Sequence, residues 1–492
     1  MTVLTPILIV PVAAGLACLL LRSRRVMAGV NLVAFAATLG LGVALLRQVL
    51  VRRVVTDWGE FLFADALSAW MVLLASAVSL ATSLYAGRYF QRDLEEQAIT
   101  PGRVREFYVL TPLFVGGMFL VVLANNLGIM WAAVEATALS SVLLVALYNR
   151  RTSLEAAWKY IMLGSLGLAL ALLGTVFVYA AACKDKPELM PSFNWSRLVT
   201  EAHAFDPRLL KLAFVLALLG YGTKAGLAPM HTWLPDAHSE APSPTSAMLS
   251  GVSLKIALYA LLRFHILASA CLGPGFSRRL LLGFGLLSMF LAPPFILVQR
   301  NLKRMLAYSS LEHIGFICAG IGIDTPVTIF GALLHMGYHA LTKPILFFAA
   351  GNIHQTCHTL ELRLIGPGLV KVLPVTVLFM GLAAAAAVGL PPFGLFFSEL
   401  TVIRGAIAGG KLTVSILILA ALIASFCGLL QQLTRILPGC PKQQRAGSGT
   451  RRLDGVPAMG LLLGGLIIFS VWLPKPLEQV MEQAAAIIGG RR

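Results

Sequence analysis

Residues Gly222–Tyr259 read GTKAGLAPMHTWLPDAHSEAPSPTSAMLSGVSLKIALY, and this stretch decides the fold. An apolar run that begins near residue 209 meets a proline-rich interruption here, and a second apolar run follows. Lys224 lies just before the interruption, and Lys255 lies inside the second run. A charged side chain at the centre of a bilayer costs at least about 2.5–3.5 kcal/mol, so such residues are rare without a role or a partner. The stretch therefore predicts a membrane-embedded helix bundle with charged groups in its interior.

The composition of the whole chain agrees with a membrane bundle. Its 492 residues are 58% hydrophobic and only 12% charged, whereas a soluble domain carries about 25% charged residues. These values exclude a disordered chain, a secreted disulfide scaffold and an ordinary cytosolic enzyme. A β-barrel is excluded because the apolar runs are far longer than a barrel strand of about 10 residues. We therefore expect an all-α polytopic membrane protein.

About fourteen apolar runs approach the roughly 20 residues that cross a bilayer. They fall near residues 3–21, 27–47, 64–86, 107–124, 127–147, 159–181, 209–230, 245–268, 279–298, 304–323, 326–350, 371–407, 411–433 and 456–473. The first run has neither a charged start nor a small-residue cleavage site behind it, so we interpret it as a spanning helix and not as a signal peptide. The tail after Pro474 has the pattern of a short amphipathic helix at the membrane interface.

The basic residues set the expected orientation. The 39 Lys and Arg and the 22 Asp and Glu leave a net charge of +17, but most of the basic residues lie in short loops, so no nucleic-acid partner is expected. An even number of spans puts both termini on one side. The loops of the other side, including Arg22–Arg25 and the basic loop Pro441–Arg452, carry more Lys and Arg. The positive-inside rule places these loops in the cytoplasm and both termini outside it.

Among the ionisable residues inside the predicted spans, seven are candidates for function. They are Glu135, Lys224, Lys255, His335, His339, Lys343 and Glu399. The three on the eleventh run are spaced i, i+4, i+8 and share one helix face. Buried ion pairs that only fix helix packing are the alternative, and they explain one such residue more readily than seven. Because histidine and buried lysine both exchange protons near neutral pH, the set predicts a proton-translocation path whose gaps are filled by water.

No metal, cofactor or catalytic residue is expected in this chain. His335 and His339 have the i, i+4 spacing that can hold zinc, but no carboxylate or cysteine joins them in the sequence, and Lys343 would oppose a cation. The loop His354–His358 also contains Cys357, and an incidental cluster is the better interpretation of a short loop. None of the seven cysteines forms the Cys-x-x-Cys spacing of iron–sulfur and zinc frameworks.

Two helices are predicted to be broken at matching places. The seventh run is interrupted at Gly226 and Pro229, and the twelfth at Gly389, Pro391 and Pro392. Both contain Gly-Leu-x-Pro, in which glycine weakens the helix and proline removes a backbone donor. Proline kinks are common in membrane helices. Matched breaks, each beside a buried charge, indicate a transporter built from two inverted five-helix repeats.

The repeats divide one membrane domain, residues 1–492. We expect N-terminal helices over 1–106, a first repeat over 107–270, a second, inverted repeat over 271–433, and a last helix with a short tail over 434–492. The break lies in the fourth run of each repeat. His231, Asp236 and His238 flank the first break and are candidates for proton uptake. Capping of the broken helix end is an equally good interpretation of these three residues.

At these residues the chain resembles the antiporter-like, proton-translocating membrane subunits shared by respiratory complex I, multisubunit cation/proton antiporters of the Mrp type and membrane-bound hydrogenases. The resemblance covers roughly residues 60–435. Besides Gly222–Tyr259, its most specific stretches are NLKRMLAYSSLEHIGF (Asn301–Phe316), HALTKPILFFAAGNI (His339–Ile353) and GLPPFGLFFSEL (Gly389–Leu400). The seven ionisable residues match the key positions of that family, so the resemblance implies that protons move through them.

The two segments HSEAPSPTSAMLSG and AYSSLEHIGF are most similar to hydrogenase-4 component F of group 4 nickel–iron hydrogenase and formate hydrogenlyase complexes. That resemblance implies a prokaryotic plasma (inner) membrane, surrounding lipid, other antiporter-like subunits, and a peripheral redox arm with iron–sulfur clusters and a nickel–iron (NiFe) centre. The chain would be a non-catalytic subunit that couples electron transfer in its partners to proton or Na⁺ movement, through switching of the pairs Glu135–Lys224 and Lys255–Glu399. The alternatives are an M-type subunit of NADH-quinone oxidoreductase and a subunit of a Na⁺/H⁺ antiporter without redox partners.

Overall fold

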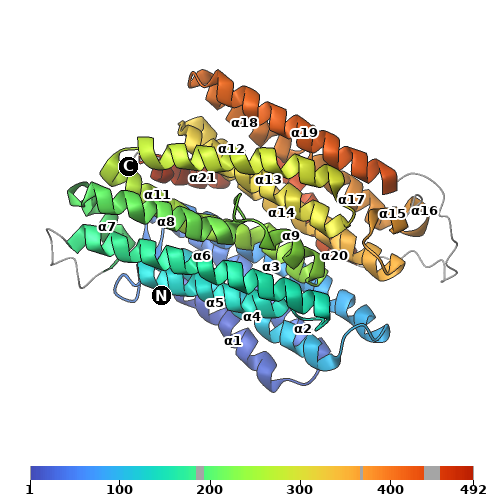
Figure 1. Ribbon diagram of the computed structural model, residues 1–492. Coiled ribbons are helices and arrows are strands. Elements are labelled where there is room, and N and C mark those ends of the chain that lie inside the picture. The colour runs from blue at the N-terminus through green and yellow to red at the C-terminus, as the bar shows by residue number, and fades with distance from the viewer. Residues whose placement is uncertain (1, 184–192, 366–368, 437–454, 491–492) are drawn as a thin grey trace.

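A computed structural model describes residues 2–183, 193–365, 369–436 and 455–490 of the chain (Figure 1). The predicted basic loop Pro441–Arg452 and Cys440 lie outside these described residues. Figure 1 places both ends of the chain at the same end of a helix bundle, as an even number of crossings requires.

Helices form nearly all of the described structure. In the first half of the chain they are α1 (Leu4–Leu20), α2 (Arg24–Arg52), α3 (Ala66–Glu95), α4 (Pro101–Leu123), α5 (Leu127–Val145), α6 (Arg151–Cys183), α7 (Trp195–Glu201), the short 3₁₀ turn η2 (Ala202–Ala204), α8 (Pro207–Ala225), α9 (Trp233–Glu240), α10 (Ser243–Met248), the π-helical turn η3 (Leu249–Ser253) and α11 (Leu254–Leu272). In the second half they are α12 (Gly275–Val298), α13 (Leu302–Ile323), α14 (Pro326–Cys357), α15 (Leu362–Ile365), α16 (Leu369–Val372), α17 (Pro374–Ala387), α18 (Gly394–Ala408), α19 (Leu412–Ile436), α20 (Val456–Val471) and α21 (Lys475–Ile488).

The predicted all-α membrane fold is confirmed, because each of the fourteen apolar runs falls on a helix or on a broken helix pair. Within the described residues, nine helices are long and apolar enough to cross a membrane by length and composition alone. The remaining runs fall on shorter or interrupted helices such as α1, α8 and α17, and on α14, whose apolar sequence is interrupted by histidines and a lysine. The sequence did not predict the small antiparallel hairpin of β1 (Val55–Asp57) and β2 (Leu62–Ala64), in which Val55 pairs with Ala64.

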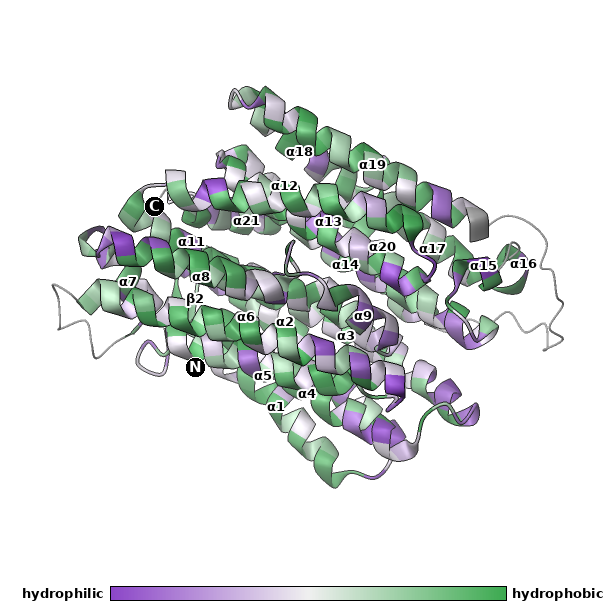
Figure 2. Ribbon diagram, viewed as in Figure 1, coloured by the Kyte–Doolittle hydropathy of each residue, from purple (hydrophilic) through white to green (hydrophobic). Residues whose placement is uncertain are grey.

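The interior of the bundle is built around α13. The membrane-crossing window of this helix is completely buried, and α12, α14 and α9 pack along it. Close approach to α12 depends on small residues, since a Cβ added to Gly285 would fall 2.7 Å from the carbonyl oxygen of Gly315. Figure 2 shows apolar residues along the helices and hydrophilic residues gathered towards their ends. Polar groups on α13 and α14 are therefore removed from water and from lipid.

Both predicted helix breaks are confirmed. Helix α8 ends at Gly226, whose φ of +77° closes the helix in the left-handed region, and α9 resumes after Pro229. Between α17 and α18, Gly389 has a φ of +71°, and the two prolines that follow it separate the helices. The π-helical turn η3 is a third irregularity and lies inside the eighth run. It contains no proline, and it was not predicted from the sequence.

The tail after Pro474 is helical, as predicted, but its surroundings differ from the expected interface. Helix α21 bends by 79° away from α20. Its buried residues recur at helical spacing on one face (Leu477, Val480, Met481, Ala484, Ala485 and Ile488). That face packs against α3 and α14, so protein and not lipid covers much of it.

Candidate functional site

The structure buries six of the seven predicted ionisable residues, and Glu135 is the half-buried exception. The buried six are Lys224, Lys255, His335, His339, Lys343 and Glu399. Four of the six, Lys255, His339, His335 and Glu399, lie in one continuous cluster around α13 and α14. Burial of this many ionisable groups is costly unless each finds a polar partner.

Lys255 is held by three acceptors. Its ammonium nitrogen lies 2.9 Å from the carbonyl oxygen of Ser250, 2.6 Å from that of Gly251 and 2.7 Å from Nδ1 of His339. The two carbonyls belong to the π-helical turn η3. Because an ammonium group only donates, Nδ1 of His339 accepts and Nε2 carries the ring proton. That Nε2 has no hydrogen-bond partner among the described residues.

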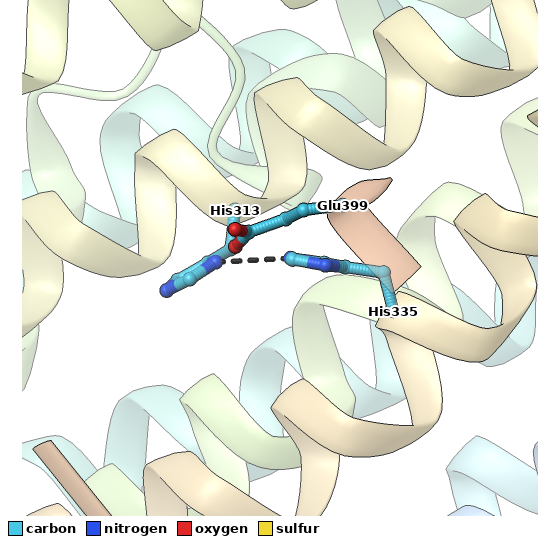
Figure 3. A group of neighbouring side chains, drawn as sticks. All are labelled: His313, His335 and Glu399. Atoms are coloured by element: carbon cyan, nitrogen blue, oxygen red, sulfur yellow. Dashed lines mark hydrogen bonds between the residues drawn. The ribbon is translucent and has the colours of Figure 1, made fainter. Parts of the chain in front are cut away.

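A row of imidazoles continues from His339 towards the second break. The rings of His339 and His313 are 4.8 Å apart, and Nδ1 of His313 lies 3.0 Å from Nε2 of His335. Nδ1 of His335 in turn lies 2.9 Å from the hydroxyl oxygen of Ser398 on α18. Figure 3 shows His313, His335 and Glu399 pointing towards one another from α13, α14 and α18. We call the set Lys255, His339, His313, His335 and Ser398 the histidine row.

Sequence reasoning missed His313 and its neighbour Glu312. Both are buried on α13, and a Glu312 carboxylate oxygen lies 3.7 Å from Nδ1 of His313. The other oxygen of Glu312 has no hydrogen-bond partner in the described part of the chain. The signal was present, because Ser-Leu-Glu-His-Ile interrupts an otherwise apolar run with two ionisable residues. Spacing along α14 alone could not reveal that His313 inserts between His335 and His339.

Lys343 is satisfied by α13 and not by an acid. Its ammonium nitrogen donates to the hydroxyl of Ser309 at 2.7 Å and to the carbonyl oxygen of Leu306 at 3.2 Å. Lys343 therefore lies on the same face of α14 as the two histidines but contacts a different turn of α13.

Lys224 and Glu135, the first predicted switching pair, form no ion pair within the described residues. Lys224 donates to the hydroxyl of Tyr160 and lies 4.6 Å from the centre of its ring. The same hydroxyl lies 2.8 Å from the side-chain oxygen of Ser141, which belongs to α5 together with Glu135. One carboxylate oxygen of Glu135 is buried without a partner in that part of the structure. Tyr160 thus links Lys224 to Ser141, on the helix that also carries Glu135.

Glu399 and Lys255 are likewise not in direct contact in the described structure, and the histidine row separates them. The Glu399 carboxylate lies against Gly389, so closely that a Cβ there would overlap it. The glycine at the second break therefore has two functions: its positive φ turns the chain, and its missing side chain leaves room for the carboxylate.

Comparison with known proteins identifies the family. The model of the membrane-embedded (TM) family described as NADH:quinone oxidoreductase/Mrp antiporter matches residues 124–425, which include both breaks and every member of the histidine row. This chain belongs to the NADH:quinone oxidoreductase/Mrp antiporter membrane family.

Relatives of this antiporter-family chain come from several complexes. It is 38% identical over 384 residues to a hydrogenase-4 component F homolog of Methylacidiphilum infernorum, a match that covers 78% of this chain and 80% of the relative. It is 32% identical over 373 residues to NADH-quinone oxidoreductase subunit N of Desulforudis audaxviator, with 75% and 71% of the two chains covered. The predicted family resemblance is thereby confirmed.

Solved structures show the same fold over nearly the whole chain. A chain of an archaeal membrane-bound sulfane sulfur reductase superposes with a TM-score of 0.85 at 23% identity, covering 99% of this chain and 98% of the other. A chain of the Mrp complex from Dietzia sp. gives 0.82 at 20% identity, covering 99% and 97%. A chain of respiratory complex I from Thermus thermophilus gives 0.73 at 26% identity, covering 96% and 98%. This antiporter-family chain is thus an antiporter-like membrane subunit of the kind found in multisubunit respiratory complexes.

The three residues predicted for proton uptake in this antiporter-family chain do not form one cluster. Asp236 forms ion pairs with Lys159, at 3.2 Å, and with Arg304. His231 packs edge-on against Tyr308. His238 is completely buried and stacked on Phe347 with ring centres 5.0 Å apart, and neither of its ring nitrogens has a partner among the described residues. The first break thus presents a paired carboxylate at the surface and an unpaired imidazole inside.

A polar cavity of about 220 Å³ lies at the end of α9, where Ser239 and Glu240 line it. It is lined by residues that include Tyr89, Arg150, Glu240, Lys303 and His354. Lys303 is buried there and donates to the carbonyl oxygen of Ala241 at 2.8 Å. The cavity is large enough to hold several water molecules.

Proposed function

We propose that this chain is the proton-translocating, non-catalytic membrane subunit of a multisubunit redox complex of the membrane-bound nickel–iron hydrogenase or formate hydrogenlyase type. The observation that supports this proposal most is the histidine row. It joins Lys255 to Ser398, beside Glu399, through imidazoles in hydrogen-bond or ring contact. An imidazole accepts a proton on one nitrogen while it releases one from the other, so a row of imidazoles moves charge without moving heavy atoms far.

The row would conduct in steps set by its two ends. When Lys255 releases a proton to Nδ1 of His339, the proton on Nε2 of that ring becomes available to His313, and from there to His335. Glu399 receives or supplies the charge beside the second break. Lys224 and Tyr160 form a second, separate arm that leads towards Glu135. Water bridges the gaps between rings that are in contact but not hydrogen-bonded.

The redox chemistry would reside in partner chains. The sequence contains no Cys-x-x-Cys framework, and the family match covers membrane helices. We infer that the partners are further antiporter-like membrane subunits and a peripheral arm with iron–sulfur clusters and a nickel–iron centre, with lipid around the bundle. The likeness to a hydrogenase-4 component F homolog supports the hydrogenase type. We also infer a prokaryotic plasma membrane, both termini outside the cytoplasm, and the two repeats at 107–270 and 271–433.

A Na⁺/H⁺ antiporter subunit without redox partners is the second candidate, and the superposition on a chain of the Mrp complex favours it. That superposition concerns the fold alone. Sodium-dependent proton exchange in vesicles that lack any hydrogenase or dehydrogenase would support this candidate over the first.

The experiment compares two histidine variants of the intact complex. His313→Gln interrupts the row, and His265→Gln is the matched control, since His265 is buried but bonded to Ser277 outside the row. In proteoliposomes we expect His313→Gln to keep electron transfer and to lower proton translocation at least tenfold, while His265→Gln keeps both. A normal ratio of protons to electrons in His313→Gln would contradict the proposal.

A further inference from the structure

Three potential metal ligands meet inside the second repeat, each from a different helix. His313 lies on α13, His335 on α14 and Glu399 on α18. Each offers one ligand atom, and these atoms all lie within 4.8 Å of one another. The i, i+4 spacing along the chain pointed to a different pair, His335 and His339. We expected no metal there, because no carboxylate or cysteine joins that pair in the sequence. The structure instead brings a carboxylate and a second helix's imidazole to His335. We call these three residues the His–His–Glu trio.

The spacing of the trio fits a tetrahedral transition metal. Two imidazole nitrogens bound to zinc at about 2.0–2.1 Å in tetrahedral geometry are about 3.3 Å apart. Nδ1 of His313 and Nε2 of His335 are 3.0 Å apart in the structure. The imidazoles therefore need to separate by only a few tenths of an ångström. A Zn²⁺ ion between them replaces the proton that they now share, and that proton leaves to solvent.

The surroundings of the trio hold the ligands as a metal site requires. The hydroxyl oxygen of Ser398 lies 2.9 Å from Nδ1 of His335, while Nε2 of the same ring faces His313. A contact of this kind fixes the tautomer and the ring orientation of a metal-binding histidine. Nε2 of His313 is buried and has no hydrogen-bond partner among the described residues, whereas its Nδ1 faces Nε2 of His335. Gly389 leaves the space that the Glu399 carboxylate occupies.

The ligand atoms of the trio indicate which class of metal ion would bind. Two nitrogens and one carboxylate oxygen suit Zn²⁺ and similar transition metals, whereas Mg²⁺ and Ca²⁺ prefer oxygen ligands. The ammonium of Lys255 opposes any cation nearby, but it is directed to two carbonyls of η3 and to His339, and not to the trio. Leu390, Pro391 and Pro392, which follow the glycine that contacts Glu399, are exposed.

We propose that His313, His335 and Glu399 form a binding site for Zn²⁺ or a similar transition metal, and that its occupancy blocks the histidine row. Binding follows from the trio alone. The block rests on the proposed function, since it assumes that the row conducts protons. A bound metal occupies the same two nitrogens that the row uses, so conduction and metal binding exclude each other.

The test measures zinc binding and transport separately on the purified intact complex. Titration with zinc chloride, followed by calorimetry, should show one saturable site per chain that is lost in His335→Gln and weakened about tenfold in Ser398→Ala, which leaves all three ligands in place. His265→Gln should keep the site. Zinc absorption spectroscopy should find two imidazole nitrogens and an oxygen at about 2.0–2.2 Å. Absence of saturable binding, or equal binding in the wild type, His335→Gln and Ser398→Ala, would overturn the site.

Transport then distinguishes the two proposals. If zinc saturates the site, it should stop proton translocation in the wild type, with half-inhibition at the free zinc concentration that half-fills the site in calorimetry. Zinc that fills the site while proton translocation continues would overturn the blocking role. Loss of translocation in His313→Gln without any zinc binding in the wild type would overturn the metal site and leave the proposed function standing.

Discussion

The ammonium nitrogen of Lys255 lies 2.7 Å from Nδ1 of His339, and the contact joins the π-helical turn of one helix to the imidazole row of another. The contact fixes which nitrogen of His339 carries its proton, and it makes Lys255 the only amine in the described residues that is hydrogen-bonded to the row. The lysine is thus placed to load the row with a proton or to withdraw one.

Replacement of Lys255 should uncouple the complex. Lys255→Met preserves side-chain length but leaves His339 without its donor, so we expect proton translocation to fall at least tenfold while electron transfer continues. The matched control is Lys211→Met, because Lys211 lies on the exposed face of α8. Simultaneous recording of electron transfer and vesicle acidification checks the prediction. Equal uncoupling by both variants would show that the effect is not specific to the row.

Removal of one hydroxyl should test the second arm. Tyr160→Phe keeps the stack on Trp233, whose ring centre is 4.3 Å away, but removes the partner of Lys224 and Ser141. We expect normal assembly and lowered proton translocation, because Lys224 loses its hydrogen-bonded connection towards α5. Tyr179→Phe, about five turns further along α6, is the control. Full translocation in Tyr160→Phe would exclude the hydroxyl from the path.

Much of this arrangement follows from local sequence, and the rest depends on tertiary neighbours. The breaks at Gly226 and Gly389 were predictable, because glycine and proline act on their own backbone. Burial of Lys255 was predictable from the apolar run around it. The place of His313 was not, since it depends on how α13 packs against α14. The same holds for the contact of Lys224 with Tyr160, since it depends on how α8 packs against α6.

Substitution of Gly389 should separate two roles of this glycine: the room that it leaves for the Glu399 carboxylate, and the positive φ that it adopts. Gly389→Ala adds a methyl group where the Glu399 carboxylate lies, at a φ of +71°. Gly410→Ala meets the same strain, with a φ of +72°, but has no atom within 4 Å of the added Cβ. We expect the control to cost about 1–3 kcal/mol and Gly389→Ala to cost more and to reduce proton translocation. Equal thermal unfolding midpoints, with translocation intact in both, would contradict this role of Gly389.

A buried ion pair outside the row should contribute to stability and not to transport. Arg263 forms two hydrogen bonds with Asp65, at 2.6 and 2.8 Å, and both residues are buried. Asp65→Asn leaves an uncompensated buried charge and should lower the free energy of unfolding by about 3–5 kcal/mol. Glu106→Gln is the control, because its exposed pair with Arg103 should contribute no more than about 1 kcal/mol. Thermal unfolding of the purified complex measures both, and equal losses would contradict the assignment.

The most direct test of the conducting row is the ratio of protons to electrons in proteoliposomes that contain Lys255→Met, His313→Gln and the double variant. Steps in series fail together, so the row predicts that each single variant lowers the ratio at least tenfold and that the double variant is no worse. An unchanged ratio in either single variant, with assembly and electron transfer intact, would contradict the account.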